Sequence, residues 1–209
     1  MAETPRSKRG KALVLAGVLL LAAALAWTAY NLMDAQRAER SVTQALEALE
    51  EMEPTPPPAT SPAQDPAPGE TPADPDQPMP TVEVEGNGYI GRLDLPGLGL
   101  SLPVLGQWSS DLLKLAPCRY QGSAYQQDLI IAGHNYRSHF GRLNQAQVGD
   151  AVRFTDGAGT TFSYVVSEIQ QLPGTAIEEM AAGDWDLTLF TCTLGGQARL
   201  TLRCTQVGA

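Results

Sequence analysis

The chain has 209 residues, 43% of them hydrophobic, and a formal net charge of −9 at pH 7. The charge is unevenly spread, because residues 1–33 sum to about +3, residues 34–80 to about −8 and the remainder to about −4. No cluster of Lys or Arg follows the N-terminal segment, so composition gives no electrostatic support for a nucleic-acid partner, and we exclude that class. A long proline-rich stretch leaves room for one modest domain.

An apolar run of 21 residues without charge occupies positions 13–33. That length is close to the roughly 20 residues that a helix needs to cross a bilayer. Four basic residues lie within positions 6–11, and Asp34 follows the run. By the positive-inside rule we expect residues 1–12 to form a cytoplasmic basic tail, residues 13–33 a single-pass membrane anchor, and everything after it to be extracytoplasmic.

The alternative for this segment is a signal peptide that is cleaved after secretion. Ala24 and Ala26 form an A-x-A pattern behind a basic start, which is typical of a cleavage site. Trp27 and Tyr30 extend the apolar run beyond that pattern and suit the interfacial belt of a membrane helix, so we favour the uncleaved anchor. Both interpretations place the folded domain outside the cytoplasm.

Residues 34–53 carry apolar side chains at helical spacing, at Val42, Ala45, Leu46, Leu49 and Met52. This pattern predicts a short amphipathic juxtamembrane helix. A dimerising coil is the alternative, although the pattern is shorter than three heptads, and the oligomeric state stays open. Residues 54–80 hold eleven of the sixteen prolines and predict an extended disordered linker that holds the domain off the membrane.

From residue 81 to 209 the chain alternates short apolar runs with turn residues. We expect strands at 89–95, 100–105, 128–132, 151–155, 160–169, 187–193 and 199–204, and helical turns at 110–115 and 176–182. Many short strands predict an all-β barrel or sandwich. Strict alternation at 89–95 and 199–203 predicts antiparallel strands with one solvent-exposed face.

Three residues at strand ends are candidates for chemistry. His134 follows the apolar strand at 128–132, Cys192 ends the strand at 187–193, and Arg199 begins the next strand beyond the turn at 194–196. A hairpin at that turn would bring Cys192 and Arg199 together. Each residue also has an ordinary explanation, as a turn histidine, a small buried hydrophobe or an exposed strand arginine. His139 is the only other histidine.

The three cysteines, Cys118, Cys192 and Cys204, are too few for a disulfide scaffold and lack the CxxC spacing of a zinc site. Outside the cytosol, Cys118 and Cys204 have the option of pairing with each other, which would leave Cys192 free; the sequence does not decide this. The acidic residues show no spacing of a calcium loop. We therefore expect no metal site and no cofactor.

The ordered set of these motifs resembles the sortase family over residues 88–205. The set comprises the opening strand Tyr-Ile-Gly-Arg-Leu-Asp-Leu-Pro at 89–96, Leu-Pro-Val at 102–104, Ala-Gly-His at 132–134, Thr-Leu-Phe-Thr-Cys at 188–192 and a strand that begins with Arg199. The resemblance implies a closed eight-stranded β-barrel in which Cys192 is the nucleophile, His134 its proton partner and Arg199 the arginine that holds the substrate carbonyl region.

The same resemblance implies that Thr191 and Asn135 bind substrate. Arg203 fits the family's arginine less well than Arg199, because the family's residue begins the last strand. The sortase class stays open, since Gly133-His134-Asn135 followed by Phe140 and Leu143 looks like class B, whereas residues 169–187 are too few for the long helix expected in that class.

The implied activity is that of a membrane-anchored cysteine transpeptidase. Such an enzyme cleaves an LPxTG-like sorting motif in secreted proteins through a thioester and passes the acyl group to an amine of cell-wall peptide or pilin. Residues 172–176 read Leu-Pro-Gly-Thr-Ala, but they lack the apolar segment and basic tail of a sorting signal, so we interpret them as a loop coincidence.

Two other functions stay open at this point. One is a cysteine peptidase that uses the same Cys192 and His134 to hydrolyse its substrate. The other is a stalked extracytoplasmic binding module in which the three polar residues play no part.

Overall fold

The computed structural model describes residues 6–52, 76–193 and 195–208. The chain divides into two compact units, Met1–Arg37 and Ala38–Ala209, which are described separately. Most of the predicted proline-rich linker and Leu194 of the predicted turn lie outside the described residues.

A single helix, α1, spans Arg6–Met52. It therefore includes about half of the predicted cytoplasmic tail, the whole apolar run at 13–33 and most of the amphipathic stretch at 34–53. Its apolar part is long and hydrophobic enough to cross a membrane, with a mean hydropathy of 2.3 in its best window and none of that window buried. Leu13 and Leu20 are 74% and 72% exposed. These properties suit a membrane anchor and also a signal sequence near the N-terminus.

Within the second unit, the end of α1 presents the predicted apolar stripe. Ala38, Val42, Ala45 and Leu49 are buried, and Val42 and Ala45 belong to the main hydrophobic core. Residues 34–52 are helical as the continuation of α1, and Val42, Ala45 and Leu49 of the predicted stripe are covered by residues of the second unit. A separate juxtamembrane helix stays a prediction.

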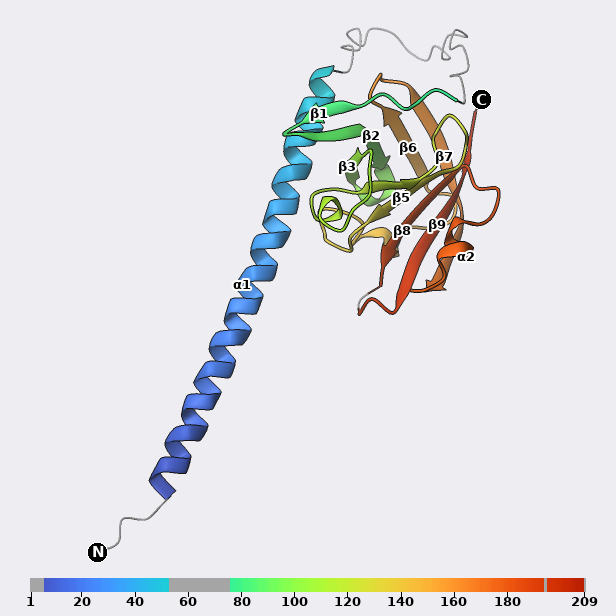
Figure 1. Ribbon diagram of the computed structural model, residues 1–209. Helices are drawn as coiled ribbons and strands as arrows, with labels where there is room; N and C mark the ends of the chain where they lie inside the picture. The colour runs from blue at the N-terminus through green and yellow to red at the C-terminus, as the bar shows by residue number, and fades with distance from the viewer. Residues whose placement is uncertain (1–5, 53–75, 194, 209) are drawn as a thin grey trace, which may run out of the picture. The chain divides into compact units, whose positions relative to one another are not determined.

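Among the described residues after α1, nine strands and three short 3-10 helices follow. Figure 1 draws the strands as arrows. The strands are β1 (Val82–Val84), β2 (Asn87–Leu95), β3 (Leu100–Leu105), β4 (Cys118–Gln121), β5 (Leu129–Gly133), β6 (Ala151–Asp156), β7 (Thr161–Pro173), β8 (Leu187–Cys192) and β9 (Ala198–Gln206). The 3-10 helices are η1 (Pro96–Leu98), η2 (Leu112–Lys114) and η3 (Leu143–Gln145), and a five-residue helix α2 (Ile177–Ala181) precedes β8. All seven predicted strands are present, whereas β1 and β4 were not predicted.

The sheet closes into a barrel of eight strands. Its order is β2-β3-β4-β5-β8-β9-β7-β6, the β2–β6 pairing closes the ring, and β1 adds to β2 as a ninth strand. The strands β2 and β9 pair antiparallel with both of their barrel neighbours, as the alternation predicted. The β5–β8 and β3–β4 pairs are parallel, so the barrel is mixed.

Barrel closure depends on Gly91, where β6 comes very close to β2. Gly91 pairs with Asp156 beside an irregularity in β2, and its φ is +152°. A Cβ at this position would overlap the carbonyl oxygen of Thr155. Only glycine therefore permits the approach that joins the two ends of the sheet.

Alternation along the strands separates an inner face from an outer face. On β5 and β8, Leu129, Ile131, Leu187 and Leu189 belong to the main core inside the barrel. The alternate residues form a second cluster on the outer face, which consists of Ile130, Ala132, Phe190 and Met180 of α2. Because α2 covers part of this outer face, the expectation that β9 has a solvent-exposed face is wrong at Thr201 and Arg203, which are 0% and 2% exposed.

Candidate active site

The site forms where β5, β8 and β9 lie next to one another at one end of the barrel. On β8 the outward positions are Thr188, Phe190 and Cys192, so Cys192 stands on the outer face at the end of the strand. Its side chain is partly exposed, whereas Cys118 and Cys204 are 0% exposed. All three thiols are free, so Cys118 and Cys204 do not pair.

The two buried cysteines are poor candidates for a nucleophile. Burial raises the pKa of each of the Cys118 and Cys204 thiols to about 12, and the Cys118 Sγ donates a hydrogen bond to the carbonyl of Ala116 at 3.4 Å. A thiol in such surroundings stays protonated and inaccessible at neutral pH. Cys192 is therefore the cysteine that reagents and substrates are able to reach.

His134 lies beside Cys192 because β5 and β8 run parallel. Their register pairs Gly133 with Thr191, so His134 and Cys192 are the next residues on adjacent strands. Neighbouring strands lie about 4.8 Å apart, which brings the two side chains to the same end of the outer face. Gly133 is required locally, since a Cβ there would come within 2.5 Å of Cδ2 of Phe140.

Arg199 faces Cys192 from the other side. The β8–β9 hairpin pairs Cys192 directly with Arg199, and Arg199 Nη1 donates a hydrogen bond to Cys192 Sγ at 3.3 Å. The guanidinium also lies over the Phe190 ring, 5.5 Å from its centroid. This contact holds the cation at the sulfur, where it attracts negative charge that develops during a reaction.

A cleft of about 510 Å³ reaches Cys192. Both predicted substrate-binding residues, Thr191 and Asn135, line it. Thr191 is 4% exposed, and its Oγ1 is buried without a hydrogen-bond partner. The other lining residues are Phe140, Gly141, Asn144, Gln171, Thr193, Gln197, Ala198 and Leu200.

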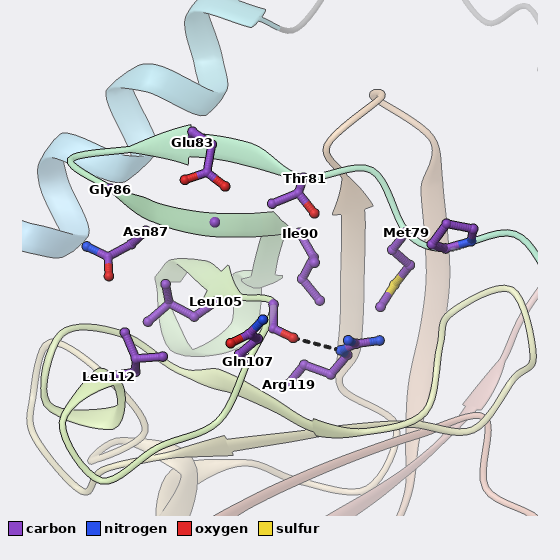
Figure 2. Close-up of a pocket in the computed structure, with 13 residues that line it drawn as sticks. Met79, Thr81, Glu83, Gly86, Asn87, Ile90, Leu105, Gln107, Leu112 and Arg119 are labelled. Carbon is purple, nitrogen blue, oxygen red and sulfur yellow. Dashed lines mark hydrogen bonds between the residues drawn. The ribbon is translucent and has the colours of Figure 1, made fainter.

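A larger cavity of about 600 Å³ lies elsewhere, beside the β1–β2 hairpin (Figure 2). Its polar lining includes Glu83, Asn87, Gln107 and Arg119, and Arg119 Nε donates to the carbonyl of Gly106 at 2.9 Å. None of its lining residues is a cysteine or a histidine. The smaller cleft is therefore the candidate active site, because it contains the accessible Cys192.

His139 and Arg203 are the other histidine and the less fitting arginine of the sequence analysis, and both have structural roles. His139 is 0% exposed, and burial lowers its pKa to about 4, so it stays neutral and out of reach of substrate. Arg203 Nη1 donates to the Met180 carbonyl at 2.6 Å and to Thr188 Oγ1 at 3.0 Å, and its Nη2 donates to the Glu179 carbonyl at 2.7 Å. It therefore fixes the last turn of α2 to the barrel.

Sequence reasoning missed two aromatic residues at the site. The Tyr136 ring stacks on His134 with a centroid distance of 4.7 Å, and Phe190 supports Arg199. No sequence signal singles out Tyr136, but Phe190 occupies the variable position of the Thr-Leu-x-Thr-Cys motif. Within the described ranges, no three His, Cys, Asp or Glu side chains lie close enough together to hold a metal ion.

Comparison with known families identifies the fold. The family model described as "Sortase domain" matches residues 93–207, which is more than half of the chain. The chain belongs to the sortase family. This is a family of cysteine transpeptidases, and the closed barrel is the sortase fold. No curated protein sequence matches the chain.

Solved sortase structures share this fold at low sequence identity. Sortase A from Corynebacterium diphtheriae is 21% identical with a TM-score of 0.54, and the match covers 59% of this chain and 62% of that one. Sortase C1 from Streptococcus agalactiae is 24% identical with a TM-score of 0.52, covering 61% and 72%. A Clostridium perfringens sortase D5 transpeptidase is 22% identical with a TM-score of 0.51, covering 57% and 79%.

These neighbours carry three different class letters, so they do not assign this sortase to a class. The chain spans less than two thirds of the length of the C. diphtheriae protein. The five-residue α2 occupies the segment where class B would have a long helix. Leu172 and Pro173 of the sorting-motif lookalike end strand β7 and pair with β9, so this segment is part of the fold.

Proposed function

We propose that this sortase is a cysteine transpeptidase in which Cys192 attacks a backbone carbonyl of a secreted protein at an LPxTG-like sorting motif. The observation that carries the proposal is the 3.3 Å hydrogen bond from Arg199 to the sulfur of Cys192, in a register that sets His134 on the opposite side. A nucleophile, a proton carrier and a fixed cation on three adjacent strands are the groups that thiol acyl transfer needs.

Each residue has a distinct role in the first half of the reaction. The guanidinium of Arg199 favours the Cys192 thiolate, whose attack on the carbonyl produces a tetrahedral oxyanion. Arg199 stabilises that negative charge as it develops. Protonated His134 then gives its proton to the departing amine, and the carbonyl collapses to a thioester on Cys192.

The second half transfers the acyl group to an amine. Neutral His134 accepts a proton from the incoming amine of a cell-wall peptide or pilin, which attacks the thioester and releases Cys192. Thr191 and Asn135 line the cleft beside the sulfur and contact the sorting motif. The buried, unpartnered hydroxyl of Thr191 offers a hydrogen bond that bound substrate satisfies.

We propose further that α1 anchors the enzyme in the membrane with its N-terminus in the cytoplasm and the barrel outside. The apolar stretch of α1 supports an anchor, and the basic residues before it support the orientation. Residues 1–12 are then the cytoplasmic tail, 13–33 the span, 34–53 the juxtamembrane helix, 54–80 the linker and 81–209 the catalytic domain.

The product of the reaction tests the transfer step. Full-length enzyme in detergent is incubated with LPxTG-like peptides and increasing triglycine, and the ligated and hydrolysed peptides are separated by mass. The proposal predicts that ligated product rises with triglycine and that turnover is lost in Cys192→Ala. Cys118→Ala, a matched thiol removal away from the cleft, should stay active.

Two outcomes would contradict the proposal. Hydrolysis that is insensitive to triglycine would assign a peptidase to the same residues. Peptide binding without any product, unchanged by Cys192→Ala, would assign a binding module.

A further inference from the structure

The loop after β5 carries three aromatic rings in a row that begins at His134, of which the first two are stacked and the second and third are tilted. The His134 and Tyr136 rings are 4.7 Å apart at an interplanar angle of 22°, which is a stacked arrangement. The Tyr136 and His139 rings follow at 5.5 Å and 41°. Tyr136 therefore lies between His134, which is half-buried, and His139, which is buried.

Backbone hydrogen bonds fix the shape of this loop. Phe140 N donates to the His134 carbonyl at 2.9 Å, and both His139 N and Gly141 N donate to the Tyr136 carbonyl, at 3.0 and 2.8 Å. The His134 and Tyr136 rings are consequently attached to one compact turn. Their stacking does not depend on a long flexible connection.

The inner end of the stack is anchored in the protein. His139 is 0% exposed, and its Nε2 lies 3.2 Å from the carbonyl oxygen of Leu115. A carbonyl only accepts, so Nε2 carries the hydrogen and donates it, while Nδ1 is the buried nitrogen without a partner. His139 thus supports Tyr136 as a neutral ring and adds no positive charge beside His134.

The face of a tyrosine ring attracts a cation more than a neutral ring. A stacked tyrosine therefore favours the imidazolium form of histidine and restricts its rotation. The titratable and charged groups on the neighbouring strands are the thiol of Cys192 on β8 and the guanidinium of Arg199 on β9. Tyr136 acts on His134 through the face of its ring, which the compact turn holds in a fixed orientation.

We propose that Tyr136 is a positioning residue for His134, which holds the imidazole parallel to its own ring and favours the protonated form that gives a proton to the leaving amine. The proton-transfer part of this inference rests on the proposed function. The stacking part concerns the free enzyme and is measured without substrate.

The test is an NMR titration of untagged, histidine-labelled full-length protein in detergent micelles. The chain has two histidines, so two imidazoles are observed, and the buried His139 serves as a non-titrating reference between pH 5 and 8. Loss of the aromatic face in Tyr136→Leu should lower the titration midpoint of His134 by about 0.5 pH unit, a three-fold change in its protonation equilibrium. Tyr136→Phe keeps the face and should retain the wild-type midpoint.

Kinetics provide a second measurement. We expect Tyr136→Leu to lower kcat for acyl transfer by about three-fold or more with little change in KM, and Tyr136→Phe to stay within about two-fold of wild type. A wild-type midpoint in Tyr136→Leu would overturn the inference. If Tyr136→Leu does not fold, nuclear Overhauser contacts between the His134 and Tyr136 rings are measured in the wild type. The absence of these contacts would also overturn the inference.

The titration separates this inference from the proposed function. A lowered midpoint in Tyr136→Leu together with no peptide product in the wild type would support the stack and refute the transfer reaction. If the wild type is an active transpeptidase and Tyr136→Leu keeps the wild-type titration midpoint of His134, the transfer reaction would be supported and the role of Tyr136 refuted.

Discussion

Replacing Arg199 with glutamine tests the contact on which the proposed site depends. Glutamine keeps a polar side chain but removes the charge that lies 3.3 Å from the sulfur of Cys192. At that separation and an effective dielectric constant of 20, the attraction between guanidinium and thiolate is about 5 kcal/mol. Both side chains are only partly buried, so solvent screens much of this energy.

The net loss should be near the value of a hydrogen bond to a charged group, about 1.5–3 kcal/mol, which corresponds to a rate change of about 10- to 150-fold. We expect kcat/KM for acyl transfer to fall by this factor in Arg199→Gln. The rate of Cys192 alkylation by iodoacetamide at pH 7 should also fall, because the cation that attracts the nucleophilic sulfur's negative charge is absent.

The assay needs a control for the general loss of an arginine. Arg153 is an exposed residue of β6 that faces Ser163 across the strand pair, and Arg153→Gln should leave both rates unchanged. Alkylation and transfer rates in Arg199→Gln within two-fold of wild type, in a folded protein, would refute the idea that this cation activates Cys192.

Three further predictions concern the residues that support the site. Burial lowers the pKa of His139 from 6.5 to about 4, so below pH 6.5 the unfolded chain binds more protons than the folded one. The free energy of unfolding, measured with urea, should therefore be about 2 kcal/mol lower at pH 5 than at pH 7. His139→Gln should reduce this difference. Arg203→Met should destabilise the fold by about 2–4 kcal/mol in the same assay, because it leaves buried acceptors without donors, and a loss under 1 kcal/mol would contradict its role in fixing α2. Gly133→Ala should push Phe140 away and lower acyl transfer, and Phe140→Leu in the same chain should restore part of the rate; equal rates in the single and double variants would argue against that clash.

Local patterns predicted that Cys192, His134 and Arg199 stand at strand ends, whereas the roles proposed for them came from the resemblance to the sortase family. Apolar strands end at Gly133 and at Cys192. Two glycines in the turn between Cys192 and Arg199 predict the hairpin that pairs these two residues. The structure adds the parallel register of β5 and β8, which brings His134 to the same place. Strand pairs so far apart in the chain leave no local signal.

Residues whose environment comes from distant parts of the chain were not predictable. Arg203 lies in an alternating strand and was expected to face solvent. Instead α2 covers the Arg203 side chain, and two backbone carbonyls of α2 accept hydrogen bonds from its guanidinium. The strand β4 has four residues and includes the polar Arg119 and Gln121, so periodicity gave no signal. Likewise, the buried His139 finds its hydrogen-bond partner in the Leu115 carbonyl, 24 residues away in the chain.

The central claim, that Cys192 forms an acyl-enzyme, is tested most directly by the intact mass of the full-length protein after incubation with LPxTG-like peptides. The account predicts a mass increase equal to the acyl part of one peptide, located at Cys192, absent in Cys192→Ala, retained in Cys118→Ala and removed by hydroxylamine. A folded protein with a free Cys192 thiol that gains no such mass from any peptide, or gains it at another residue, would contradict the account.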